Sequence, residues 1–112
     1  MVAPSPGTVV VVRFPFSDLS SSKLRPAIAV APAGSGDWIL CQVTSNPYSD
    51  PAAVELLDND FARGSLQRTS YARPGKLFTA NESLMVFEAG ALKVESFRRV
   101  VSAIVAIITQ SG

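Results

Sequence analysis

Four consecutive valines, Val9 to Val12, constrain the fold more than any other feature of this sequence. They lie in a stretch from Thr8 to Phe14 that is β-branched almost throughout, which favours an extended strand. Successive side chains of a strand point to opposite faces, so a continuous apolar run predicts a strand that is buried on both faces, or nearly so. Pro15 follows directly and ends the strand, because proline has no N–H to donate to a ladder.

The other strands predicted from the sequence are shorter and are separated by glycine and proline. We expect them at residues 27–31, 38–44, 53–57, 69–73, 76–79 and 84–88. The Pro- and Gly-rich segment 32–37 predicts a turn that joins the first two of them as a hairpin. Pro74-Gly75 is expected to end the strand at residue 73. Residues 58–61 are expected to form one helical turn that stops at Gly64.

The C-terminal segment has the period of a helix that starts between Lys93 and Ser96. Its apolar stripe, at spacings of three and four, consists of Phe97, Val100, Val101, Ile104 and Ile108. Five to seven short strands followed by one helix of about four turns predict a small, mainly β barrel or curled sheet, closed on one side by the helix. At 112 residues the chain is expected to form one domain, 1–112.

Composition excludes several classes of function. With 10 Lys plus Arg against 9 Asp plus Glu, any contact with nucleic acid must rest on a few placed cations rather than on a broad basic surface. The absence of histidine excludes a histidine general base and imidazole metal sites, and a single cysteine, Cys41, excludes an internal disulfide. Without a secretory signal or a bilayer-spanning segment, we expect a soluble, cytoplasmic protein. We also expect it to use no metal and no cofactor.

A serine-rich loop from Arg13 to Ala27 is the first candidate wall of a phosphate-binding site. It brings Lys23 and Arg25 to the entrance of a strand, and loops held by a rigid scaffold often carry function. Pro26 restricts Arg25 to extended geometry, and the planar guanidinium of an arginine can grip a phosphate through two parallel hydrogen bonds. Both cations can equally be read as solvated loop charges.

The second candidate wall is Gln42-Val43-Thr44-Ser45, at the end of an apolar strand. Thr44 and Ser45 offer two adjacent hydroxyls that could donate to a phosphate oxygen, although strand-end hydroxyls commonly satisfy backbone groups instead. Adjacent strands joined by a short turn usually pair, so the two walls are expected to meet.

Four blocks of the sequence resemble, in order and spacing, the MazF/PemK-like toxins. They are FPFSDL at 14–19, SKLRPA at 22–27, LCQVTS at 40–45 and SYARPGKLFT at 70–79. The resemblance covers nearly the whole chain from Gly7 to the helix. It departs from the family at Thr8, where an acidic residue usually follows the glycine, and at Ser20 to Ser22, where a glycine is often found.

The resemblance implies an SH3-like, CcdB/PemK-type β-barrel with a C-terminal helix that works as a homodimer. Members of this family are sequence-selective endoribonucleases that need no metal and are neutralised by a cognate antitoxin. They cleave single-stranded RNA by attack of the ribose 2′-hydroxyl on the adjacent phosphate, which leaves a 2′,3′-cyclic phosphate and a 5′-hydroxyl. The family's catalytic arginine and threonine match Arg25 and Thr44, and Ser45 matches an adjacent hydroxyl position.

Further residues are candidates for contact with RNA. They are Lys23, Gln42, Ser45, Phe16, Asp18, Arg73 and Lys76. Arg73 and Lys76 can equally be surface charges, whereas Phe16 and Tyr48, both in expected loops, could stack on bases.

Two other functions fit the same sequence. One is a non-catalytic, CcdB-like toxin that binds a DNA topoisomerase, and the other is a small barrel that binds RNA without cleaving it. The pair Arg25 and Thr44 favours the ribonuclease, because a topoisomerase-binding relative has no use for it.

Overall fold

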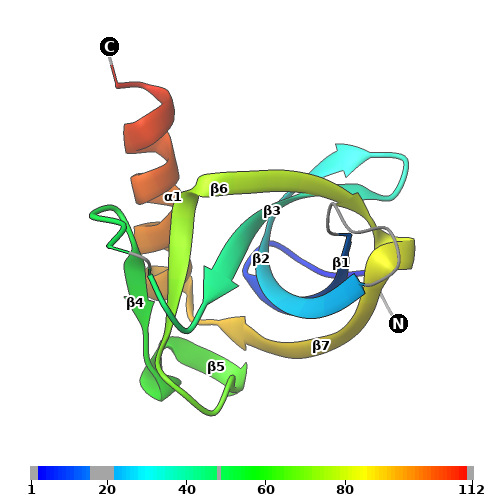
Figure 1. The fold of residues 1–112 in the computed structure, drawn as a ribbon, viewed down its shortest axis with the longest axis horizontal. Coiled ribbons are helices and arrows are strands. Elements are labelled where there is room, and N and C mark those ends of the chain that lie inside the picture. The colour runs from blue at the N-terminus through cyan, green and yellow to red at the C-terminus, as the bar shows by residue number, and fades with distance from the viewer. Residues whose placement is uncertain (1–2, 16–21, 48, 111–112) are drawn as a thin grey trace.

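An antiparallel sheet that curls on itself makes up most of the computed structural model, which describes residues 3–15, 22–47 and 49–110 (Figure 1). Within these residues the sheet has seven strands in the order β4-β6-β3-β2-β1-β7-β5. The strands are β1 (Thr8–Pro15), β2 (Ser22–Gly34), β3 (Asp37–Thr44), β4 (Val54–Leu56), β5 (Phe61–Gly64), β6 (Ser70–Asn81) and β7 (Met85–Leu92). Two 3₁₀ turns, η1 (Asp58–Asp60) and η2 (Glu82–Leu84), and the helix α1 (Val94–Ile108) complete the fold. This arrangement confirms the predicted class, a curled β-sheet with a C-terminal helix.

The valine run is buried on both faces, as predicted, because the sheet separates two apolar clusters. We call the first the helix-side core: it contains Val9, Ile28, Cys41, Val43, Leu56, Phe61, Ala72, Leu92, Val100 and Ile104. We call the second the opposite core: it contains Val10, Val12, Ala27, Ala29, Trp38, Leu40, Ala80 and Met85. Val9 therefore faces one cluster, and Val10 and Val12 face the other, which is the alternation that a strand imposes.

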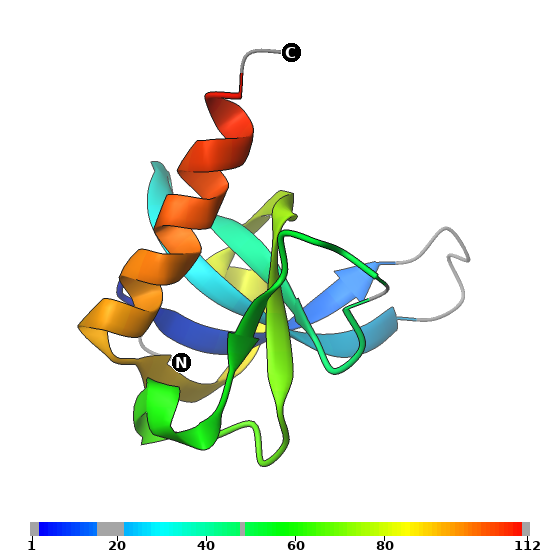
Figure 2. The same cartoon turned by 90° about the vertical axis from the view of Figure 1, so that its left-hand side faces the viewer.

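Helix α1 covers the sheet beside β4 and β6 (Figure 1). Val100 and Ile104 are buried in the helix-side core, and Phe97 packs against it. Ile108 was expected in the same stripe, but its side chain is 67% exposed because the last turn projects beyond the sheet (Figure 2). Among the described residues, no helix combines the length and apolarity needed to cross a membrane.

The start of α1 is fixed by Asp60 of η1 rather than by its own N-cap, Lys93, whose side chain makes no capping bond. The Asp60 Oδ1 atom accepts from Ser96 Oγ at 2.8 Å and from Arg99 Nη2 at 2.6 Å. Partial burial raises the pKa of Asp60, but these bonds, together with one from the Leu57 N–H, lower it below its usual value overall.

Strand β2 is longer than the sequence suggested. Lys23 and Arg25 were expected in a loop, but both belong to β2, which pairs with β1 as far as Pro15 and Ser22. The loop expected from Arg13 to Ala27 is thus mostly strand. Pre-proline geometry is extended, so the restriction that Pro26 places on Arg25 suits a strand as well as a loop.

The break expected at Pro74-Gly75 was wrong, because β6 runs through both residues. Between the pairs Val43–Ala72 and Cys41–Leu77, β3 advances by two residues while β6 advances by five. Pro74 lies in this bulge, where a missing N–H costs no regular ladder bond. The Arg73 carbonyl oxygen accepts a hydrogen bond there from Cys41 Sγ at 3.3 Å. The thiol is buried, which raises its pKa to about 12, so Cys41 is structural, as predicted.

Gly64 was expected to stop a helical turn, but η1 ends earlier and Gly64 lies in β5, paired with Gly90 of β7. The two backbones approach so closely that a Cβ on Gly64 would lie 2.2 Å from the Ala89 carbonyl oxygen. Only glycine fits such a contact.

Candidate functional site

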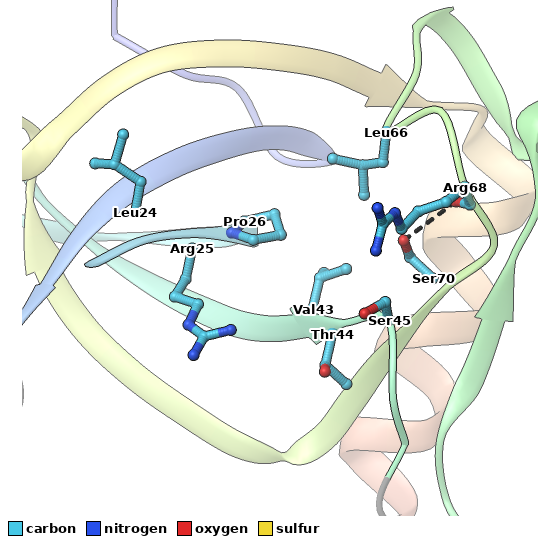
Figure 3. Close-up of a pocket in the computed structure, with 9 residues that line it drawn as sticks. All are labelled: Leu24, Arg25, Pro26, Val43, Thr44, Ser45, Leu66, Arg68 and Ser70. Carbon is cyan, nitrogen blue, oxygen red and sulfur yellow. Dashed lines mark hydrogen bonds between the residues drawn. The ribbon is translucent and has the colours of Figure 1, made fainter.

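The two predicted walls meet where β2 and β3 separate. The ladder between these strands ends at the pair Ala27–Gln42. The next residue of β2 is Pro26, which has no N–H to continue the ladder. A pocket of about 190 Å³ opens there (Figure 3). Its lining residues are Leu24, Arg25, Pro26, Val43, Thr44, Ser45, Leu66, Arg68 and Ser70.

Three consecutive residues of β2, and three more at the end of β3 and just after it, border this pocket, so both faces of the sheet contribute to it. Arg25 pairs with Val12, which belongs to the opposite core. Thr44 lies four residues after Leu40, which belongs to the same core. Alternation therefore directs Arg25 and Thr44 to the same face. Figure 3 shows both side chains extending to one side of the strands, away from Leu66.

The Thr44 hydroxyl has a fixed position, because its Oγ1 atom accepts a hydrogen bond from the Asn46 N–H at 3.1 Å. A hydroxyl has one proton and two lone pairs, so this bond leaves the proton available for donation. An arginine and a hydroxyl donor on one face form a site suited to an anion with several oxygens, such as a phosphate diester.

Sequence reasoning missed the third wall of the pocket, which the segment from Leu66 to Ser70 supplies. Arg68 brings a second guanidinium, and Ser70 Oγ donates to the Arg68 carbonyl oxygen at 3.2 Å. In Figure 3, Arg68 lies across the pocket from Arg25, near Ser45. Ser70 begins the fourth block of the family resemblance, but no local pattern marks Leu66 or Arg68. The segment reaches the site because β6 pairs with β3 although two strands separate them in the chain.

The remaining predicted residues take several positions. Lys23 is exposed on β2. Gln42 and Lys76 meet in a second pocket of about 100 Å³, which Leu77 and Phe78 also line. Gln42 is two residues from Thr44 on the same face, about 7 Å along the strand.

Arg73 forms an ion pair with Asp50, from Nε to Oδ2 at 3.1 Å, and both side chains are largely buried. Two hydrogen bonds lower the pKa of Asp50. The one from the Ala52 N–H contributes most, and the one from Arg73 contributes next. This pair anchors the segment that follows β3. Phe16, Asp18 and Tyr48 lie outside the described residues. Across the part of the chain that the structure describes, no three His, Cys, Asp or Glu side chains form a group able to hold a metal ion.

No protein-family model matches this sequence, and no curated protein is similar to it. Solved structures are similar to it over their full length. A MazE-MazF complex from Deinococcus radiodurans aligns with a TM-score of 0.77 and 18% identity, over 99% of this chain and 100% of the other. An endoribonuclease in complex with its cognate antitoxin, from a mycobacterial species, aligns with a TM-score of 0.72 and 16% identity, over 100% and 99% of the two chains.

Mycobacterium tuberculosis toxin MazF-mt6 is similar as well, with a TM-score of 0.71, 12% identity, and coverage of 94% of this chain and 99% of that one. At these identities the likeness is one of fold. The chain has the fold of the MazF toxins from end to end, as its resemblance to the MazF/PemK-like family implied.

Proposed function

We propose that this chain is a MazF/PemK-like toxin, an endoribonuclease that cleaves single-stranded RNA, and that residues 1–112 act as one catalytic domain. One observation carries the proposal: Arg25 and Thr44, which match the family's catalytic pair, lie on one face at a gap between two strands of a MazF fold.

The reaction uses the nucleophile that RNA itself carries. The 2′-oxygen attacks the adjacent phosphorus, a bond forms between them, and the bond to the 5′-oxygen of the next nucleotide breaks. The products are a 2′,3′-cyclic phosphate and a 5′-hydroxyl, and the proton lost by the 2′-hydroxyl is balanced by the one gained at the leaving oxygen. Because attack is intramolecular, orientation supplies much of the rate enhancement.

Arg25 and Thr44 act on the phosphate in this scheme. Negative charge grows on the non-bridging oxygens as the 2′-oxygen attacks, and a guanidinium held in place stabilises that charge. The Thr44 hydroxyl donates to the same group. Arginine remains protonated at any physiological pH, so Arg25 acts through its charge and its hydrogen bonds rather than as a base.

The polar groups around the pair hold the rest of the strand. Ser45 and Arg68 line the same pocket, and Lys23 lies two residues before Arg25 on the same face of β2, where it can contact a neighbouring phosphate. Gln42 and Lys76 extend the polar surface along β3 and β6. Phe16, Asp18 and Arg73 are further proposed contacts with RNA.

The proposed assembly is a cytoplasmic homodimer that a cognate antitoxin neutralises. Similar solved chains include MazF bound to MazE and an endoribonuclease bound to its antitoxin. Light scattering at working concentration should give twice the mass of the 11.8 kDa chain. A monomeric mass would contradict this part of the proposal.

Incubation of the purified protein with mixed-sequence RNA in EDTA tests the activity. We expect cuts at preferred sequences that leave a 2′,3′-cyclic phosphate and a 5′-hydroxyl, identified by end-specific ligation and sequencing. RNA that stays intact at micromolar protein would overturn the proposal. RNA that is retained but never cut would favour the non-catalytic binding barrel instead.

A further inference from the structure

Strand register places two further side chains beside the proposed catalytic pair. Thr44 of β3 pairs with Tyr71 of β6, and Tyr71 pairs with Glu55 of β4. On the other side of the site, Arg25 of β2 pairs with Val12 of β1. Because directly paired residues of an antiparallel sheet point to the same face, Thr44, Tyr71 and Glu55 form one row across three strands.

The face of this row is fixed by its neighbours. Val43, Ala72 and Val54, each one residue away from a member of the row, belong to the helix-side core or pack against it. Alternation therefore directs Thr44, Tyr71 and Glu55 away from α1, to the face that Arg25 also occupies. No register shift separates the pairs Val43–Ala72 and Thr44–Tyr71, or interrupts the three pairs of β4 and β6.

The row brings chemically different groups into order. Neighbouring strands lie about 4.8 Å apart, so the Tyr71 backbone is about 5 Å from that of Thr44, and the Glu55 backbone is about 10 Å from it. Tyr71 is half-buried and Glu55 is exposed, so the ring has a supported side and the carboxylate is open to solvent. The order across the face is a cation, a hydroxyl, an aromatic ring and a carboxylate.

We propose that Tyr71 and Glu55 form the base-binding subsite of this enzyme and set its preference at a nucleotide next to the cut; the proposal rests on the ribonuclease function above. With the phosphate held at Arg25 and Thr44, the attached nucleotide extends along the row. Its base stacks on the Tyr71 ring, as unpaired bases stack on aromatic side chains in other RNA-binding proteins. Tyr71 and Glu55 are specificity-determining residues in this scheme, and neither takes part in the bond changes.

Glu55 decides which base the subsite accepts. An ionised carboxylate only accepts hydrogen bonds, so it favours a base that presents an exocyclic amino group. Adenine, cytosine and guanine have such a group, whereas uracil carries carbonyl oxygens at the corresponding positions. The subsite therefore disfavours uracil.

The test is to sequence the ends that the wild-type protein and three variants leave in the same mixed-sequence RNA. We expect Glu55→Gln to raise the share of uracil at one position beside the cut by about tenfold, because the amide can also donate. Tyr71→Ala should raise KM about tenfold or more, with a smaller effect on kcat, and Tyr71→Phe, which keeps the ring, should raise KM much less than Tyr71→Ala does. Glu95→Gln, which removes an exposed carboxylate from α1, is the matched charge control.

A binding measurement separates this proposal from the catalytic one. Oligonucleotides of A, C or U with 2′-O-methyl groups cannot be cleaved by internal attack, so their affinity does not depend on catalysis. Tyr71→Ala should weaken all three about tenfold, and Glu55→Gln should raise the affinity for oligo-U relative to oligo-C. If wild-type protein cuts RNA and neither variant changes base frequencies or these affinities, the subsite is wrong and the ribonuclease stands. If nothing is cut, the ribonuclease is wrong, and unchanged affinities would overturn the subsite as well.

Discussion

The two ends of the β2–β3 pair differ in what their polar side chains do. At the hairpin end, Asn81 Nδ2 donates to Asp37 Oδ1 at 3.0 Å, and Trp38 Nε1 donates to Glu82 Oε2 at 3.0 Å. At the other end, beyond Ala27, polar side chains border a pocket. The same two strands thus close the fold at one end and open a site at the other.

This difference teaches that a single interruption of the ladder is enough to open a pocket in an otherwise closed pair of strands. Leu40 and Ala29 pair in the middle of the strands and are fully buried. Three residues before Ala29, Pro26 removes a donor, and the strands separate. Substitutions on the hairpin side should therefore lower stability and spare activity, whereas substitutions at the gap should do the reverse.

Leu40→Ala should have the largest effect on stability. The side chain is completely buried in the opposite core, and Leu-to-Ala changes of this kind cost about 2–5 kcal/mol. Urea denaturation measures the loss, with Val86→Ala, at a residue that is 41% exposed, as the control. A loss no greater than that of the control would show that the hairpin half does not hold the fold.

Arg25→Ala should have the largest effect on activity. Removal of a preorganised charge-stabilising donor typically lowers kcat by about 10²–10³, and we expect the free energy of unfolding to change by less than about 1 kcal/mol. Arg25→Lys should recover only part of the rate, because a lysine cannot form two parallel hydrogen bonds. Single-turnover cleavage assays measure the rates of both variants. Arg98→Ala, at an exposed arginine of α1, is the control, and an Arg25→Ala rate equal to it would remove Arg25 from the mechanism.

Trp38→Phe and Thr44→Val compare one polar group from each end. Trp38→Phe removes the bond to Glu82 and some buried surface, so we expect a loss of about 1–3 kcal/mol of stability with unchanged cleavage. Thr44→Val preserves shape and should lower cleavage about tenfold or more, with a stability change near 0.5 kcal/mol. Thermal unfolding and cleavage rates are measured on the same samples. A loss of cleavage in Trp38→Phe, or a large loss of stability in Thr44→Val, would contradict this division between the two ends.

The smallest effect should appear at acid pH, in the segment that follows β3. The pKa of Asp50 is lowered in the folded chain, so its contribution to stability is present above the usual Asp pKa of about 4 and disappears as the pH falls through the lower folded value. Wild type should therefore be more stable than Asp50→Asn near pH 7, and the difference should shrink towards about pH 3. Denaturation midpoints at several pH values measure this difference in stability. A difference that stays constant with pH would show that protonation of Asp50 does not contribute to the loss of stability in acid.

The sequence predicted those parts of the fold that local patterns control. The valine run and the hairpin around residues 32–37 follow from residue type, and the presence of α1 follows from its period. Ile108 follows the same period yet is exposed, because how far the sheet extends beneath a helix is not encoded in the helix itself. The break expected at Pro74 was wrong for a related reason, since only the partner strand shows that a bulge accommodates the proline.

The site divides in the same way. Arg25 and Thr44 could be named because each lies in a block that resembles a known family. Arg68 and Glu55 lie outside those blocks, and Tyr71 lies within one that assigns it no role. The positions of all three depend on the complete sheet order, in which β6 pairs with both β3 and β4. Long-range pairing, rather than any local motif, brings Arg68 to the pocket and sets Tyr71 and Glu55 in one row with Thr44.

The length of the bulge in β6 determines which side chains of this strand face the site. Residues 73–76 connect the part of β6 that pairs with the hairpin half of β3 to the part that carries Tyr71. Deletion or insertion of one residue there would exchange the faces of Tyr71 and Ala72, turning an aromatic ring towards the helix and a methyl group towards the RNA. A change of two residues would restore the ring to its face but set it beside a different neighbour on β3. Variation in the length of this segment among related chains would thus alter base preference without touching Arg25 or Thr44.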